Sequence, residues 1–231
     1  MNIRISEIKR ESLQSLKGNW GLTVLLSFII SILIYVLFIM VELILTSGLY
    51  VWFNQDEIRG VIGLINLIIY ISLIPLSIGV YWFYLSLVRE NNPQISTVLA
   101  VYHNGKTSIK LILAVILQKI FVLLWSMLFF IPGIIKTIAY SQTFYILRDH
   151  PEYSIFEAIS ESRRRMYGFK WKYFLLVLSF IGWGILCVFS LGIGFLWLVP
   201  YVTTAMATFY NQVIYSQDAD ISEAIVIKKL G

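Results

Sequence analysis

Long apolar runs separated by short polar segments dominate the pattern of this chain. A helix needs about 20 apolar residues to cross the roughly 30 Å hydrocarbon core of a bilayer. The runs that are long enough are about 20–45, 61–88, 107–131, 171–190 and 194–215. Residues 132–148 form a sixth, shorter candidate, which either spans the membrane or is a re-entrant segment. The pattern therefore predicts an all-α polytopic membrane protein with six transmembrane helices.

The composition supports a membrane location. Of the 231 residues, 58% are hydrophobic and 13% are charged, and the mean hydropathy is +0.79. Soluble domains are roughly 45–50% apolar and about 25% charged. So little charge cannot cover a soluble protein of this length, so we expect lipid to cover much of the surface. We expect one integral membrane domain over residues 1–231, without a disulfide framework because Cys187 is its single cysteine.

Basic residues gather in alternate polar segments. Most of the 18 lysines and arginines lie in residues 1–19, in the linkers that follow Arg89 and Arg148, and in the tail 216–231. The positive-inside rule places these segments, and therefore both termini, in the cytoplasm. Residues 1–19 are predicted to form an amphipathic helix on that face. The net charge of +5 follows from this bias and does not indicate nucleic-acid binding.

The even-numbered spans share several features. Each carries one proline, at Pro75, Pro132 or Pro200, and a short amphipathic segment follows each span. An aromatic pair follows each proline: Phe83-Tyr84, Phe144-Tyr145 and Phe209-Tyr210. We interpret this as three parallel hairpins, possibly an internal threefold repeat; alternatively, three hairpins with cytoplasmic linkers look alike by accident. Pro132 and Pro200 suit a first helical turn, whereas Pro75 should kink its helix.

The middle amphipathic segment carries a cluster of positive charge. Ser154 and Glu157 have the spacing of a capping box, which predicts a helix start. The positions Ile155, Ala158, Ile159, Ser162 and Met166 can share one face of that helix. The basic residues beside or opposite that face, and just beyond it, are Arg163, Arg164, Arg165, Lys170 and Lys172. They are candidate contacts for anionic lipid headgroups; the alternative is that they only set the topology.

Two lysines fall within apolar runs, where an isolated charge is costly. Lys136 either snorkels to the outer boundary of the membrane or pairs with Glu42 near the outer end of its own span. Lys119 lies near the middle of the hydrocarbon, where oxygens of Gln118, Tyr140 and Gln142 could surround it. It is then a structural hydrogen-bond hub, part of a polar path for an anion or headgroup, or a snorkelling side chain.

Motifs for catalysis and for cofactors are missing. The two histidines, His103 and His150, lie in different linkers, and no H-E-x-x-H, G-x-S-x-G or P-loop motif occurs. A metal site needs several such ligands close together. We therefore expect no enzyme activity, no metal and no cofactor.

Several stretches together resemble the integral membrane family known as domain of unknown function 975. They are "LKGNWG", "IPGIIKTIAYSQTFYILRDHPE", "EAISESRRRMYGFKWKYFLLVLSFIGWGILCVFSLGIG" and "FLWLVPY" with the later "FY". The resemblance covers most of the chain and is weakest over 46–75. It implies a multi-pass protein of the cytoplasmic membrane of Gram-positive bacteria, with no established activity and no catalytic residues.

We expect a non-catalytic membrane component that engages membrane lipids, or a partner protein or a second copy, through its amphipathic helices. The alternatives are a transporter-like protein with a polar path near Lys119, and an immunity or resistance protein against membrane-active agents.

Overall fold

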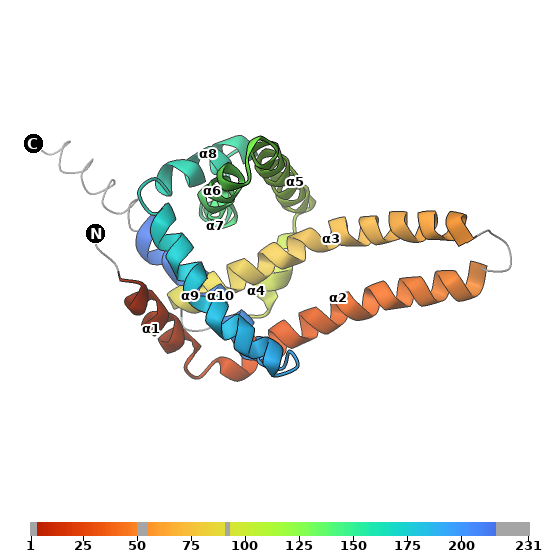
Figure 1. Ribbon diagram of the computed structural model, residues 1–231, viewed down its shortest axis with the longest axis horizontal. Helices are drawn as coiled ribbons and strands as arrows, with labels where there is room; N and C mark the ends of the chain where they lie inside the picture. Colours follow the sequence, from red (N-terminus) through yellow and green to blue (C-terminus); the bar gives the residue numbers. More distant parts are fainter. Residues whose placement is uncertain (1–3, 50–54, 91–92, 216–231) are drawn as a thin grey trace, which may run out of the picture.

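Helices make up almost all of the chain that the structure describes. This computed structural model describes residues 4–49, 55–90 and 93–215 (Figure 1), and none of these residues lies in a strand. The all-α class is therefore confirmed, and the predicted tail 216–231 lies outside the described residues. The first half contains α1 (Ile5–Leu16), α2 (Trp20–Leu49), α3 (Gln55–Glu90), α4 (Ser96–Leu99) and the 3₁₀ turn η1 (Ala100–Tyr102). The second half contains α5 (Gly105–Leu128), α6 (Phe130–Tyr140), α7 (Thr143–Asp149), α8 (Ile155–Arg165), α9 (Lys170–Phe189), α10 (Phe195–Phe209) and the π-helical η2 (Tyr210–Tyr215).

Within the described part of the chain, four helices are long and apolar enough to cross a membrane. They are Trp20–Ile44, Arg59–Arg89, Gly105–Leu128 and Lys170–Phe189. The expectation of six continuous spanning helices is therefore wrong, because the other two predicted spans are interrupted. The predicted span 132–148 is divided between α6, with 11 residues, and α7, with 7 residues. The predicted span 194–215 is divided between α10, with 15 residues, and η2, with 6 residues.

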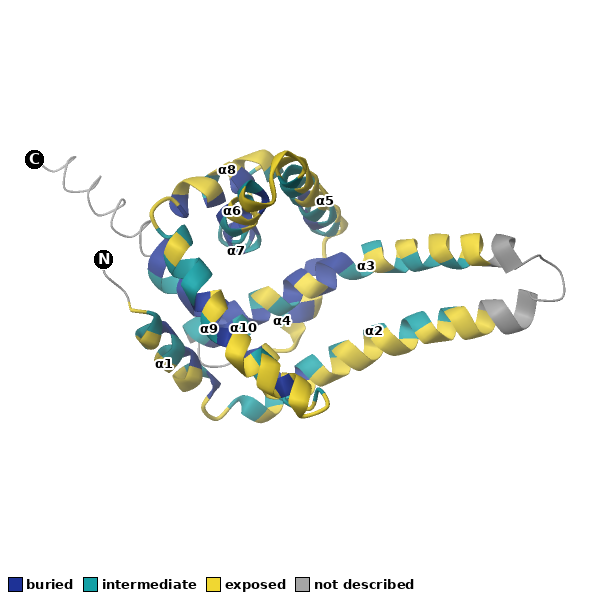
Figure 2. Cartoon of the chain, viewed as in Figure 1, coloured by how far each residue is buried: buried dark blue, intermediate teal, exposed yellow. Residues whose placement is uncertain are grey.

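The helices α2 and α3 form a hairpin that extends away from the other helices (Figure 1). Apolar side chains on this hairpin are exposed (Figure 2); Leu64 is 64% exposed and Ile68 is 63% exposed. The buried core lies elsewhere, where the ends of α3 and α10 meet, and it includes Phe83, Tyr84 and Phe209. A helix pair with so much exposed apolar surface is suited to lipid as its solvent.

The helices α1, α4 and α8 each pack on a different part of the fold. The surface helix α1 contacts α10, α4 contacts α3, and α8 contacts both α6 and α7. The predicted capping box opens α8: Glu157 accepts a hydrogen bond from the backbone N–H of Ser154 at 2.6 Å, and the Ser154 hydroxyl accepts one from the Glu157 N–H at 3.3 Å. The predicted inner face is also largely confirmed, since Ala158, Ile159 and Ser162 are buried.

Hydroxyl groups of the short segments pair with backbone groups where two of the long elements are interrupted. Pro75 lies inside α3 and lacks an N–H. The Tyr102 hydroxyl donates to the carbonyl of Ser72 at 2.7 Å and accepts from the N–H of Leu76 at 3.2 Å. It thus lies between two groups that bond directly in an uninterrupted helix.

A side chain of α8 forms hydrogen bonds in a similar way with backbone groups at the break between α6 and α7. The Ser162 hydroxyl donates to the carbonyl of Ala139 at 2.8 Å and accepts from the N–H of Gln142 at 3.2 Å. Unpaired backbone groups are costly when they are buried, and Ser162 itself is fully buried. The α8 helix therefore stabilises the break on which it packs.

We expect Tyr102→Phe to lower the free energy of unfolding by about 1–3 kcal/mol, because it leaves the Leu76 N–H and the Ser72 carbonyl without the bridging hydroxyl. The measurement is denaturant unfolding in detergent micelles followed by circular dichroism. Tyr35→Phe is the control, because Tyr35 is 68% exposed on α2. Equal effects of the two substitutions would contradict the bridging role.

Candidate functional site

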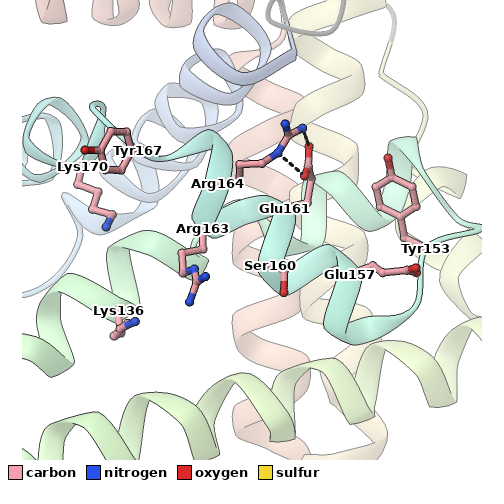
Figure 3. A pocket seen from close by; sticks show the side chains of 9 residues that line it. All are labelled: Lys136, Tyr153, Glu157, Ser160, Glu161, Arg163, Arg164, Tyr167 and Lys170. Carbon is pink, nitrogen blue, oxygen red and sulfur yellow. Dashed lines mark hydrogen bonds and ion pairs between the residues drawn. The ribbon is translucent and has the colours of Figure 1, made fainter.

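A groove rich in basic side chains lies between α6, α8 and the start of α9 (Figure 3). We call it the basic groove; it encloses about 950 Å³. Its lining residues are Lys136, Tyr153, Glu157, Ser160, Glu161, Arg163, Arg164, Tyr167 and Lys170. Of the five residues predicted to contact headgroups, the groove gathers Arg163, Arg164 and Lys170.

Three cations approach the same opening of this groove from three helices. Figure 3 shows Lys136 of α6 opposite Arg163 of α8, with Lys170 of α9 beside them. Both Arg163 and Lys170 are near enough to act electrostatically on Lys136. Within the described residues, none of these three side chains forms an ion pair. Like charges held together in this way favour the binding of an anion.

The other two arginines of the cluster share one carboxylate. Arg164 donates to both oxygens of Glu161, at 2.8 and 2.6 Å, and the Arg165 Nε donates to Glu161 Oε1 at 2.6 Å. The hydrogen bond from Arg164, together with Arg165, lowers the pKa of Glu161 below its ordinary value against the opposing effect of burial. Arg165 is only 5% exposed, so its prediction as a surface contact is not supported by its position.

Lys172 lies outside the groove. Its ammonium group is 5.9 Å from the centre of the Phe169 ring, at the start of α9. Of the five predicted headgroup contacts, Arg163 and Lys170 face the groove without a carboxylate partner among the described residues. Arg164 and Arg165 bind Glu161, and Lys172 lies outside the groove. The spacing of the charges along the sequence did not reveal this division.

The location of Lys136 differs from the prediction. Lys136 lies 4.1 Å from the centre of the Trp125 ring and faces α8 rather than an outer boundary. Glu42 is an exposed residue of α2, and no contact between Glu42 and Lys136 is found among the described residues. The predicted depth rested on the position of Lys136 one turn beyond Pro132, and both residues do lie on α6.

The polar residues predicted around Lys119 are also not gathered there. Lys119 is exposed on α5, and its ammonium group donates to the Tyr70 hydroxyl of α3 at 2.8 Å. Gln118 instead lines a separate cavity of about 310 Å³, together with tyrosines that include Tyr145. Gln142 is buried and donates to the Ser141 hydroxyl at 2.7 Å. Tyr140 lies beside the Phe121 ring and lines a groove next to Lys136.

A cluster that the sequence did not predict joins the ends of three helical segments. We call it the junction cluster: Arg89, Asp149, Tyr210 and Asn211. Arg89 forms a two-fold ion pair with Asp149 at 2.7 and 2.8 Å and donates to Asn211 at 2.9 Å. Tyr210 donates to Asp149 at 2.7 Å. The sequence feature that could have indicated this cluster is the repeated Phe-Tyr pair, because each of the four residues lies in such a pair or within a few residues of one.

The burial and charge of the junction cluster act in opposite directions on Asp149. Burial raises the pKa of Asp149, but the hydrogen bonds from Arg89 and Tyr210 and the charge of Arg89 outweigh it, so the pKa lies below its ordinary value of 3.8. Planar pairing of this kind between arginine and carboxylate is strong and directional.

The structure thus combines four helices that are long and apolar enough to cross a membrane with a groove rich in basic side chains. The chain belongs to the family described as "Protein of unknown function (DUF975)", whose model matches residues 1–139 and 128–217. This confirms the resemblance seen in the sequence. No curated protein and no solved structure matches the chain.

We expect Asp149→Asn to lower the free energy of unfolding by about 3 kcal/mol near neutral pH, because it leaves Arg89 without its charge partner. Because the pKa of Asp149 is lowered on folding, its ionised form stabilises fully above the ordinary value of 3.8. That contribution is lost as the pH falls through the lowered pKa. The wild-type chain should therefore lose more stability than the variant over this acidic range.

The measurement is the thermal midpoint in detergent micelles as a function of pH. Glu152→Gln is the matched control, because Glu152 is an exposed carboxylate three residues beyond Asp149. An unchanged acidic loss of stability in Asp149→Asn would show that other carboxylates are responsible.

Proposed function

We propose that this chain is a multi-pass protein of the cytoplasmic membrane, without catalytic activity, that binds anionic lipid headgroups in the basic groove. Both termini lie in the cytoplasm in this proposal. The chain crosses the membrane six times, with α6–α7 and α10–η2 as the two shorter returns.

The junction cluster supports the two shorter returns. If only the four long helices crossed the membrane, Arg89 would follow the second crossing and Asp149 the third. The two residues would then lie on opposite sides of the bilayer, yet they form an ion pair at 2.7 Å. Asn211, beyond α10, also contacts Arg89. These contacts favour a return of all three segments to one side, and the distribution of lysine and arginine favours the cytoplasm as that side.

The packing of the short helices supports the threefold repeat. One short helix packs on the second helical segment of each proposed hairpin: α4 lies on α3, α8 on α6–α7, and α1 on α10. The helices α1 and α8 also match at a constant spacing of residues, in the pairs Glu7 and Glu157, Ser12 and Ser162, and Gly18 and Gly168. Both glycines have a positive φ, +88° and +82°, which favours glycine. The α1 helix thus closes a ring of three hairpins.

The convergence of Lys136, Arg163 and Lys170 is the observation that carries the proposed lipid role. Each cation near a membrane surface contributes about 1 kcal/mol to the attraction of anionic lipid. A role in topology alone requires basic residues in a linker, but it does not require a lysine from α6 to meet them. A transport path has less support, since Lys119 bonds to Tyr70 at an exposed position. An immunity role has no residue in the structure to support it.

The topology is tested with single cysteines introduced in a Cys187→Ala background. Leu191→Cys and Tyr167→Cys are suitable because these side chains are 94% and 83% exposed. A membrane-impermeant thiol reagent should label position 191 on intact cells and position 167 only after permeabilisation. Labelling of position 167 on intact cells would overturn the orientation and the site's location in the inner leaflet.

The lipid role is tested by native mass spectrometry of the purified full chain with phosphatidylglycerol or phosphatidylcholine. We expect Arg163→Gln to weaken phosphatidylglycerol binding roughly fivefold, and Arg163→Gln with Lys170→Gln roughly thirtyfold. Lys106→Gln is the control, because Lys106 is exposed at the start of α5 and does not line the groove. Absence of any preference for phosphatidylglycerol in the wild-type chain would reject the proposal.

A further inference from the structure

We infer that the ligand of the basic groove is a phospholipid with two acyl chains that straddle α6, one chain on each side of that helix. This inference rests on the proposed function, since the anionic headgroup lies between Lys136, Arg163 and Lys170. It adds the chemical class of the whole ligand and two acyl-chain sites.

The first acyl-chain site is an apolar groove between α6 and α9. It encloses about 440 Å³ and is lined by Ile131, Ile134, Ile135, Ile138, Lys170, Trp171 and Phe174. The four isoleucines have the spacing i, i+3, i+4 and i+7, so they form one face of α6. Lys170 is the only polar side chain in this lining, and it also lines the basic groove. The apolar groove therefore adjoins the proposed headgroup position.

The second acyl-chain site lies on the other side of α6. It encloses about 260 Å³ and is lined by Phe121, Trp125, Lys136, Tyr140, Phe156, Ile159, Ser160 and Arg163. Its apolar side chains come from α5, α6 and α8. Lys136 and Arg163 belong both to this lining and to the basic groove. Each apolar groove thus shares its cationic residues with the basic groove.

The shape and charge of these three grooves together match one kind of occupant. A positive centre with two apolar arms is complementary to an anionic headgroup with two chains. A free phosphate would use only the centre, and a lipid with one chain would fill only one arm. Both apolar grooves are lined by residues of α6, a helix of 11 residues that ends at Tyr140.

The experiment compares lipids that differ separately in charge and in chain number. Native mass spectrometry of the full chain in detergent micelles measures competition among dioleoyl phosphatidylglycerol, oleoyl lysophosphatidylglycerol, dioleoyl phosphatidylcholine and oleoyl lysophosphatidylcholine. A groove-filling variant, Ile135→Trp, occupies the first apolar groove; Ile135 is 43% exposed and can accept a larger side chain. Ile181→Trp is the matched control, because Ile181 is an exposed residue of α9 outside this groove.

We expect the preference for two chains over one, measured among the phosphatidylglycerols, to be at least about tenfold stronger in the wild-type chain than in Ile135→Trp. Ile181→Trp should retain the wild-type preference. Ile135→Trp should still prefer oleoyl lysophosphatidylglycerol to its phosphatidylcholine counterpart, because the three cations remain.

Three results would contradict the inference in different ways. An unchanged two-chain preference in Ile135→Trp, with the charge preference intact, overturns the acyl-chain sites and leaves the headgroup proposal standing. If the wild-type chain does not prefer phosphatidylglycerol to phosphatidylcholine, with either one or two acyl chains, the proposed function is rejected as well. Loss of a dimer peak on Ile135→Trp substitution, without an effect on lipid, assigns the groove to a second copy of the chain.

Discussion

The ion pair between Arg89 and Asp149 is the contact on which the arrangement of the helices depends. It joins the end of α3 to the end of α7, and Asn211 and Tyr210 add the end of α10 to the same point. The helices α2 and α3 extend well beyond this junction (Figure 1). Removing one partner of this partly buried pair leaves the other charge without compensation, so the pair ties the three ends to one another. The hairpin of α2 and α3 exposes apolar surface beyond this junction (Figure 2), and such surface is suited to lipid.

The grooves around α6 follow from the interruption of that helix. Because α6 ends at Tyr140 and α8 packs across the break, Lys136 faces Arg163. The Ser162 hydroxyl at this break and the Tyr102 hydroxyl at Pro75 serve the same purpose, since each satisfies two backbone groups of an interrupted helix. Short surface segments are therefore structural parts of the membrane helices beside them. The basic groove is a consequence of how one of those segments packs.

Apolar run length and helix-capping chemistry made the helical class, the long helices and the start of α8 predictable. Local signals did not reveal the break at Ser141-Gln142, because neither residue is a helix breaker and the cause is packing by α8. The sequence also did not show which of the neighbouring arginines pair with a carboxylate, because this depends on where the Glu161 side chain lies in the folded chain. The junction cluster could not be predicted because its members are brought together only by tertiary structure, although the repeated Phe-Tyr pairs lie next to it.

The packing of α1 on α10 has a consequence for the order of assembly. The Ser12 hydroxyl donates to the Thr208 hydroxyl at 3.0 Å, across 196 positions of the sequence. Synthesis proceeds from the N-terminus, and contacts between distant parts of a chain form late. The α1 helix thus completes this packing only after α10 has been synthesised. Until then its apolar face, with Ile8 and Leu16, has the bilayer surface as its nearest apolar surroundings.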